Sequence, residues 1–192
     1  MDIVDAIENR RSIRNFKRIN VAEDILKEIF TYASYAPSHY MTESWQIKLY
    51  QDKGKESFID EIMLSYQRIG LVASPLDEKS KKMILSMTEF LMKIPHHALI
   101  YFEKLDDPIR FEEEYASICA FIQNAQLVAW KYGVGMLWTI TPYMHDKDFI
   151  KAIDLEPTKH KIAAVMQIGY PESIPPNKGR MPIDKKLEII SD

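Results

Sequence analysis

The chain has 192 residues, of which 46% are hydrophobic and 28% charged. This composition is typical of one folded globular domain and excludes a disordered or low-complexity chain. Because 25 Lys and Arg stand against 28 Asp and Glu, a net charge of −3, we expect no general attraction to nucleic acid or to an anionic membrane. One Cys and six Gly exclude a disulfide framework and argue against a glycine-rich phosphate loop.

The N-terminus carries charges too early for an export signal. Asp2, Asp5, Glu8 and Arg10 leave no apolar stretch of the required length. The longest apolar run near the middle of the chain, 98–102, is far too short to cross a bilayer. A single Cys also suits a reducing compartment. We therefore expect a cytoplasmic protein.

Hydrophobic spacing predicts two helices in the first part of the chain. Residues 2–9 and 22–34 carry apolar side chains at positions that repeat with the helical period. Asn20 is a candidate cap for the second helix, and Pro37 stops it. The alternating, aromatic residues of 45–51 predict a strand.

The stretch 54–94 is polar and rich in methionine. It predicts two helices that are broken near Ser74 and Pro75. Its large apolar side chains either form an adaptable cover over a site or pack the helices on their own core, because methionine fills gaps in many cores. These side chains are Met63, Tyr66, Met83, Met87, Phe90 and Met92.

The second half of the chain alternates between strands and helices. Residues 98–102 read as a central strand, and 112–132 as a long helix that is apolar on most sides. Glu112–Glu114 would form its negative first turn, and Gly133 would end it in the left-handed conformation. The remaining elements are strands over 134–140 and 162–168 and a short helix over 146–153.

The tail behaves differently from the rest of the chain. Prolines keep residues 171–192 extended, yet Ile183, Leu187, Ile189 and Ile190 are apolar and need burial. This arm either docks on a neighbouring subunit, as in a dimer with exchanged arms, or wraps around its own domain. We divide the chain into a domain over 1–170 and this arm.

Two short cationic clusters are candidate anion sites. The guanidinium fork matches phosphate oxygens, and a hydroxyl adds a further donor. Taken alone, each cluster could equally be a solvated cationic surface. The side chains are Arg10, Arg11, Ser12 and Arg14 in the first cluster, and Lys178 and Arg180 in the second.

Four segments, in this order, resemble the FMN-dependent nitroreductase family. The opening "ENRRSIRNF" and the segment "YAPSHYMTESWQIKLY" resemble the start of that family and its Ala-Pro-Ser segment. Further along, "IQNAQLVAWKYGVGMLW" resembles its long central helix, and "AAVMQIGYPESIPPNKGRMPIDKKL" its last strand and basic arm. The resemblance covers nearly the whole chain, with 52–110 the weakest stretch.

The resemblance implies a fold and an activity. The fold would be α+β, with three α/β/α layers, a central mixed sheet covered by helices, and a C-terminal arm exchanged in a homodimer. One FMN would bind in each of two interface sites. NADH or NADPH would donate electrons, and a nitroaromatic, a quinone or a similar small molecule would accept them. The flavin N5 would carry the chemistry, so we name no catalytic side chain and no metal.

The resemblance also assigns cofactor contacts to residues of this chain. Arg10, Arg11 and Ser12 would hold the phosphate and ribityl chain, and Lys178 and Arg180 would reach the phosphate from the arm. A second group would lie along the flavin ring. Arg14 would lie near N1 and O2, and the backbone of Leu137, Trp138 and Thr139 would lie at the N5 edge. Pro37, Ser38 and Met41 would lie on a segment that comes from the other subunit in many members. Trp138 could equally be a core residue.

The chain departs from the family pattern A-P-S-x-x-N-x-Q-P-W. Met41, Glu43 and Ser44 stand at the Asn, Gln and Pro positions. Met41 cannot donate the hydrogen bond that Asn offers, and an ionised Glu43 would oppose an anionic reduced flavin. Two alternatives therefore stay open. One is a flavin-handling or sensing protein without ordinary turnover, and the other is a member that performs reductive dehalogenation or ring dehydrogenation.

Other reactive side chains suggest no separate site. His96 and His97 are adjacent, so in a strand they would face opposite ways and could not share a metal. We expect Cys119 to be a small buried hydrophobic residue and not a nucleophile. His39 and Tyr40 either line the substrate entrance or are exposed loop residues.

Overall fold

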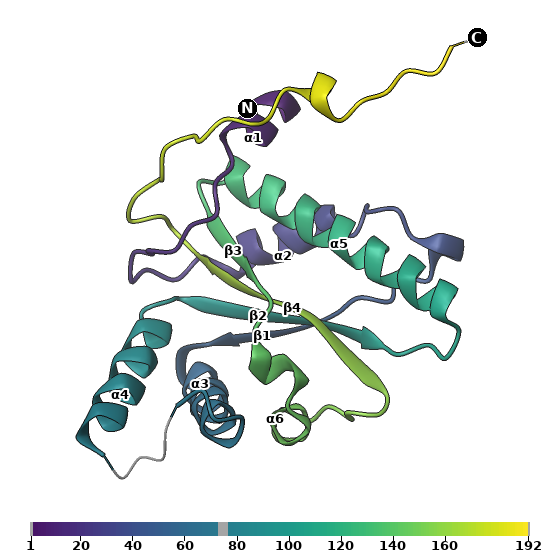
Figure 1. The fold of residues 1–192 in the computed structure, drawn as a ribbon. Helices are drawn as coiled ribbons and strands as arrows, with labels where there is room; N and C mark the ends of the chain where they lie inside the picture. The colour runs from purple at the N-terminus through teal and green to yellow at the C-terminus, as the bar shows by residue number, and fades with distance from the viewer. Residues whose placement is uncertain (1, 73–76, 192) are drawn as a thin grey trace.

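The computed structural model describes residues 2–72 and 77–191. A four-stranded sheet lies between two layers of helices, with α1, α2 and α5 over one face and α3, α4 and α6 over the other (Figure 1). The α+β, three-layer prediction is confirmed. The helices are α1 Ile3–Asn9, α2 Glu23–Ala33, α3 Asp52–Arg68, α4 Glu78–Met92, α5 Pro108–Lys131 and α6 Lys147–Ala152, with 3₁₀ turns η1 His39–Met41, η2 Pro142–His145 and η3 Ile183–Lys185. The strands are β1 Gln46–Gln51, β2 His96–Glu103, β3 Gly135–Thr139 and β4 His160–Gly169.

The sheet has the order β1-β2-β4-β3, and every neighbouring pair of strands is antiparallel. The predicted mixed sheet is therefore wrong for these four strands. The single helix α5 joins β2 to β3, so these two strands run in the same direction, but β4 lies between them and runs opposite to both. Within the described ranges, the parallel pairing is limited to one isolated bridge, Ser12 to Met136.

Helix α5 forms the centre of one face of the molecule. It begins at Pro108 with Asp107 as its N-cap, so Glu112–Glu114 does not form the first turn as predicted. The predicted ending is confirmed, because Gly133 has a φ of 68° directly after the helix. Its buried stripe passes through Phe121 and leaves Cys119 only partly buried, contrary to our expectation.

The opposite face has its own apolar core. Phe58 and Phe149 are fully buried between the sheet and the helices α3 and α6. Met63 and Met87 pack into this cluster, whereas Met83 is 45% exposed. The methionines of 54–94 thus belong mainly to the helices' own core.

Two details at the ends of helices differ from the sequence prediction. Asn20 does not cap α2, because Ala22 occupies the N-cap position without a side-chain hydrogen bond, and the Asn20 amide donates instead to Asp52, at 2.9 Å. The predicted break near Ser74 and Pro75 lies outside the described residues, between α3 and α4.

His96 and His97 are both buried at the start of β2. Burial lowers the pKa of His97 to about 4. In the described part of the chain, no group of three or more His, Cys, Asp or Glu could hold a metal ion, and no helix is long and apolar enough to span a membrane.

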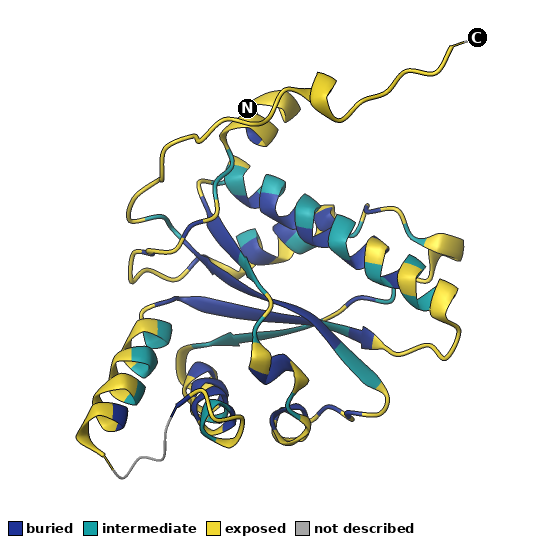
Figure 2. Ribbon diagram, in the orientation of Figure 1, coloured by how far each residue is buried: buried dark blue, intermediate teal, exposed yellow. Residues whose placement is uncertain are grey.

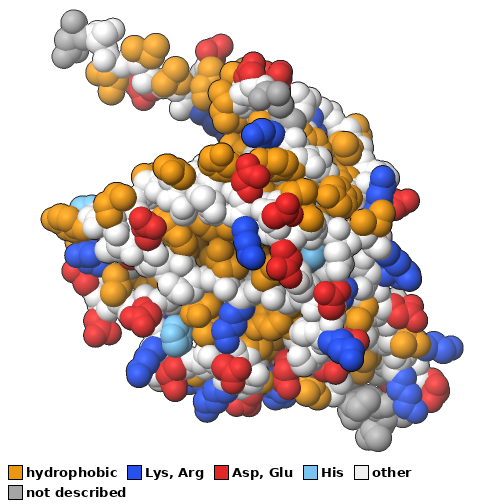
Figure 3. Space-filling model, turned by 180° about the vertical axis from the view of Figure 1, so that it is seen from behind, with side chains coloured by type: hydrophobic (Ala, Val, Ile, Leu, Met, Phe, Trp, Pro, Cys, Tyr) orange, Lys and Arg blue, Asp and Glu red, His pale blue; other side chains and the backbone are white. Residues whose placement is uncertain are grey.

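The C-terminal arm is extended and exposed (Figure 2). It passes close to α1 and then projects away from the body (Figure 1). Figure 3 shows hydrophobic side chains along this projecting part. Ile189 and Ile190 are 78% and 83% exposed. The apolar arm therefore finds little burial against its own chain.

Candidate cofactor site

The N-terminal segment that carries the first cationic cluster lies along the free edge of β3. The Ile13 N–H donates to the Met136 carbonyl at 3.1 Å, and Ser12 forms the parallel bridge to Met136. Gly135 makes this close packing possible, because a Cβ there would lie 2.4 Å from Cγ1 of Ile13. The residue types at 13 and 135 thus fix where the segment that carries Arg10 and Arg11 lies.

Cations from both ends of the chain meet in this region. The pKa of Arg10 lies below its ordinary value, first because of burial and then because of the positive charges of Arg180 and Arg11. The Nε of Arg10 is buried and has no hydrogen-bond partner among the described residues. We call Arg10, Arg11 and Arg180 the cationic cluster. Its members repel one another, so an anion between them would stabilise all three.

The loop of the arm brings Arg180 to this place. Gly179 has a φ of 70°, a conformation that suits glycine, and its N–H donates to the Asn177 side chain at 2.8 Å. Within residues 2–72 and 77–191, the three arginines form no ion pair with Asp or Glu. A cluster of guanidinium groups without acidic partners fits a phosphate group.

Other predicted phosphate and ring contacts are exposed near the same segment. Ser12, Arg14 and Lys178 all reach solvent. Neither Arg14 nor Lys178 forms a hydrogen bond or an ion pair with the rest of the described chain. Their side chains are therefore available to a ligand.

Strand β3 has an open edge beside the cationic cluster. Leu137 is buried, and the Thr139 hydroxyl donates to the Val165 carbonyl at 2.7 Å. Met136 turns its carbonyl toward the N-terminal segment, so Trp138, two residues on, turns its backbone toward the same edge. The Trp138 side chain is half-buried, and its Nε1 has no partner in the described residues. This edge leaves polar groups for a ligand to satisfy.

The predicted contacts at 37–41 lie in a different part of the same chain. The Ser117 hydroxyl donates to the Pro37 carbonyl at 2.6 Å, near the N-terminal half of α5. The cationic cluster lies toward the other end, where Trp130 packs against the small buried group that contains Ile13. Ser117 and Trp130 are thirteen positions apart on the helix, a distance of about 20 Å. One chain alone does not bring the two groups together.

Residues 37–42 take an unusual backbone conformation. Tyr40, Met41 and the adjoining Glu43 have φ values of 52°, 55° and 45°. Tyr40 and Met41 are 81% and 75% exposed, which favours their reading as surface residues that a ligand or a second chain can reach. Sequence reasoning identified the segment, but its left-handed turn carries no glycine and so gave no signal in the sequence.

Comparison with known proteins identifies the same family as the sequence motifs. A sequence model of the nitroreductase family matches residues 7–170. A protein of Bacillus subtilis strain 168 that is named NAD(P)H nitroreductase YfhC is 30% identical over 180 residues. The alignment covers 93% of this chain and 89% of YfhC. The iodotyrosine deiodinase of Hydra vulgaris is 26% identical over 196 residues, covering 96% of this chain and 71% of that protein.

A solved structure shares the whole fold. The nitroreductase-like family protein of Bacillus cereus superposes with a TM-score of 0.90 at 31% identity, covering 100% of this chain and 97% of the other. The alignment includes both layers of helices and the arm.

Proposed function

Because the chain belongs to the nitroreductase family, we propose that it is an FMN-dependent NAD(P)H oxidoreductase that works as a homodimer. The cationic cluster is the observation that carries this proposal. Arg10, Arg11 and Arg180 lie together without an acidic partner in the described residues, as a phosphate site requires.

The chain's own groups would hold the two ends of the cofactor. The cationic cluster would hold the phosphate, with Ser12 and Lys178 as further donors. The open edge of β3 would hold the ring, with the Trp138 backbone facing it and Arg14 placed to stabilise negative charge at the pyrimidine end. Bound FMN would supply a hydride acceptor at N5 and pass electrons to a small-molecule acceptor such as a nitroaromatic or a quinone.

A second copy of the chain would complete the site. The 37–42 segment lies about 20 Å along α5 from the cationic cluster of its own chain, so it would meet the cofactor held by the partner subunit. The exposed apolar residues of the arm 171–192, with Ile3, Val4 and Ile7 on α1, supply surface for the dimer. A single Cys per chain suits a reducing, cytoplasmic setting.

Reductive dehalogenation is a second candidate reaction. The likeness to the Hydra vulgaris iodotyrosine deiodinase favours it. Such a reaction would use the same cofactor grip with a different acceptor. The Met41, Glu43 and Ser44 departures lie on the segment that borders the acceptor, so acceptor choice is the property they would change.

The visible spectrum of the purified protein tests the proposal. We expect a flavin spectrum, native or after FMN is added, that bleaches when NADH or NADPH is supplied without oxygen. Reoxidation by a quinone or by an iodinated phenol would then separate the two candidate reactions. Protein that binds FMN but is not bleached by either nucleotide would support the flavin-handling alternative, and protein that refuses FMN would refute the proposal.

A further inference from the structure

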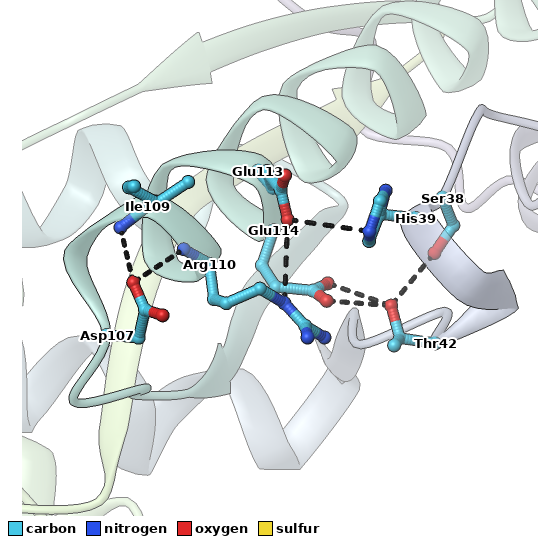
Figure 4. Close-up of polar contacts among 8 residues, drawn as sticks. All are labelled: Ser38, His39, Thr42, Asp107, Ile109, Arg110, Glu113 and Glu114. Carbon is cyan, nitrogen blue, oxygen red and sulfur yellow. Dashed lines mark hydrogen bonds and ion pairs between the residues drawn. The ribbon is translucent and has the colours of Figure 1, made fainter.

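Four residues on one face of α5 contact the 37–42 segment (Figure 4). Arg110, Glu113, Glu114 and Ser117 follow the i, i+3, i+4, i+7 spacing of a helix face. We call these four residues the α5 clamp. Each contacts a different residue of the segment: Arg110 lies 5.8 Å from the Tyr40 ring centroid, Glu113 lies 4.0 Å from His39, Glu114 accepts from Thr42, and Ser117 donates to Pro37.

Glu114 has the most buried side chain of these contacts. It is 3% exposed, an uncommon position for a carboxylate. The Thr42 hydroxyl lies 2.8 Å and 3.1 Å from its two oxygens. A buried carboxylate must be hydrogen-bonded to be tolerated, so Glu114 and Thr42 constrain each other.

The contact continues as a directed chain of hydrogen bonds. Because Thr42 gives its only hydroxyl hydrogen to Glu114, the Ser38 hydroxyl must donate to Thr42 across their 3.0 Å contact. Ser38 in turn accepts from the Glu43 N–H at 2.9 Å. The Ser38 hydroxyl is thus occupied within the segment, and its effect on a cofactor would come through the shape of the turn.

This chain of bonds spans the strained turn. Left-handed φ values cost about 1 kcal/mol or more for each residue with a side chain, and they persist only where the surroundings enforce them. The bonds from Glu43 through Ser38 and Thr42 to Glu114 close over Tyr40 and Met41, whose φ values of 52° and 55° are the highest in this segment. Tyr40 and Met41 are 81% and 75% exposed, so a ligand or a second chain can reach both side chains.

We propose that Glu114 is a positioning residue that acts through Thr42 to hold Tyr40 and Met41 against the acceptor space. This inference rests on the proposed function, in which the 37–42 segment borders the cofactor held by the partner subunit. Met41 and Glu43 stand where the family pattern has Asn and Gln, so no side-chain amide is available at these two positions, and we expect the segment to act through its backbone shape. The contacts from Glu114 and Ser117 on α5 stabilise that shape.

Two pairs of variants test the role in the FMN-loaded dimer. Thr42→Val removes the hydroxyl with little change in shape, and Thr42→Ser restores it. Glu114→Leu removes the acceptor, and Glu114→Gln keeps one carbonyl oxygen. Glu112→Gln is the matched control, because Glu112 is exposed on the same helix and forms no hydrogen bond with the described residues. The readouts are KM and kcat for a quinone acceptor and the rate at which protease cuts the 37–43 region.

We expect Thr42→Val and Glu114→Leu to raise the acceptor KM about tenfold, the equivalent of one charge-assisted hydrogen bond. Both should speed cleavage of the 37–43 region, while Thr42→Ser stays near wild type and Glu114→Gln falls between. Wild-type KM and cleavage rate in Thr42→Val would overturn the proposal. So would an equal rise of KM in Glu112→Gln.

The cleavage readout separates this inference from the proposed function. If wild-type protein fails to bind FMN, the proposed function fails. Cleavage of the unloaded Thr42→Val and Thr42→Ser proteins then still decides whether Glu114 holds the segment. Faster cleavage in Thr42→Val alone would support that structural step, and equal rates in both variants would refute it.

Discussion

The cationic cluster and the α5 clamp both belong to the proposed cofactor site, yet they differ in how their charges are satisfied. In the cluster, Arg10 is crowded by Arg180 and Arg11 and finds no acid in the described residues. In the clamp, Glu113 pairs with Arg110 at 3.5 Å, and Glu114 accepts from Thr42. The cluster therefore leaves positive charge for a ligand to balance, whereas the charges of the clamp are paired within the chain, although Nε of Arg110 and Oε2 of Glu113 form no hydrogen bond with the described residues.

The difference separates two kinds of functional residue. A group left unsatisfied by its own chain is arranged to bind something, and a ligand that binds it stabilises the folded state. A group satisfied by its own chain can still serve function, because it fixes the shape of a neighbouring segment.

Removal of the arm's apolar end should abolish both regions' function together. A chain that stops after Met181 keeps Lys178 and Arg180 but loses Ile183, Leu187 and the two isoleucines beyond them. We expect a shift from dimer to monomer in light scattering, with loss of turnover, because the 37–42 segment would no longer reach the second cofactor. A truncated protein that stays dimeric and active would show that the arm only covers its own domain.

Loss of the cluster's charge should weaken phosphate recognition alone. Two charge-assisted hydrogen bonds, at about 1.5 kcal/mol or more each, predict that Arg10→Ala with Arg180→Ala lowers FMN affinity about 100-fold or more. Flavin fluorescence titration measures this. Riboflavin, which has no phosphate, should bind the variant and the wild type alike.

The matched control for this pair is Arg18→Ala, a cation further along the same N-terminal segment. It should leave FMN affinity unchanged. If riboflavin lost as much affinity as FMN, the two arginines would be holding the ring or the fold instead of the phosphate.

A methyl group at Gly135 should displace the cluster without changing its charge. The new Cβ would lie 2.4 Å from Cγ1 of Ile13 and 3.0 Å from Cγ of Pro171. Overpacking of this kind costs about 1–3 kcal/mol, so Gly135→Ala should lower both the free energy of unfolding and FMN affinity. Gly54→Ala in α3, where nothing lies within 4 Å, should match or exceed wild-type stability. Urea unfolding compares them, and equal values for the two variants would contradict the close packing.

Acid should lower the free energy of unfolding of the whole domain, and so affect both regions equally, because His97 is buried in β2 of the central sheet. Burial lowers the pKa of His97 from 6.5 to about 4. The unfolded chain therefore binds this proton first, and stability falls as the pH drops through the interval between these two values. Between pH 6.5 and pH 5.5 we expect a loss of about 1 kcal/mol.

His97→Leu tests the source of that loss in urea unfolding at the two pH values. The variant also loses the 3.1 Å contact with the Leu91 carbonyl, so its stability at neutral pH will differ from wild type. Only the slope is compared, and an unchanged slope would place the effect on another group.

Local features of the sequence predicted most of the elements but not all of their limits. The period of apolar residues found α2 and the long helix α5, and Gly133 marked where α5 ends. The start of α5 was placed four residues late, because the cap at Asp107 precedes the apolar pattern. The family resemblance implied a mixed sheet, but all three pairs of named strands are antiparallel. The direction of a pair depends on which strands become neighbours, and the residues of a single strand do not determine that.

The site divides in the same way. The types of Arg10, Arg11 and Arg180 indicated an anion site, and four motifs in order indicated the family. The packing of the chain around one sheet brings Arg10 close to Arg180. The same packing places residues 37–42 beside the N-terminal half of α5. Glu114 was predicted to lie in a negative first turn of the helix, and it is instead the buried anchor of a strained loop. Residue type and spacing set local conformation and chemistry, whereas burial and contacts between distant segments depend on how all the elements pack at once.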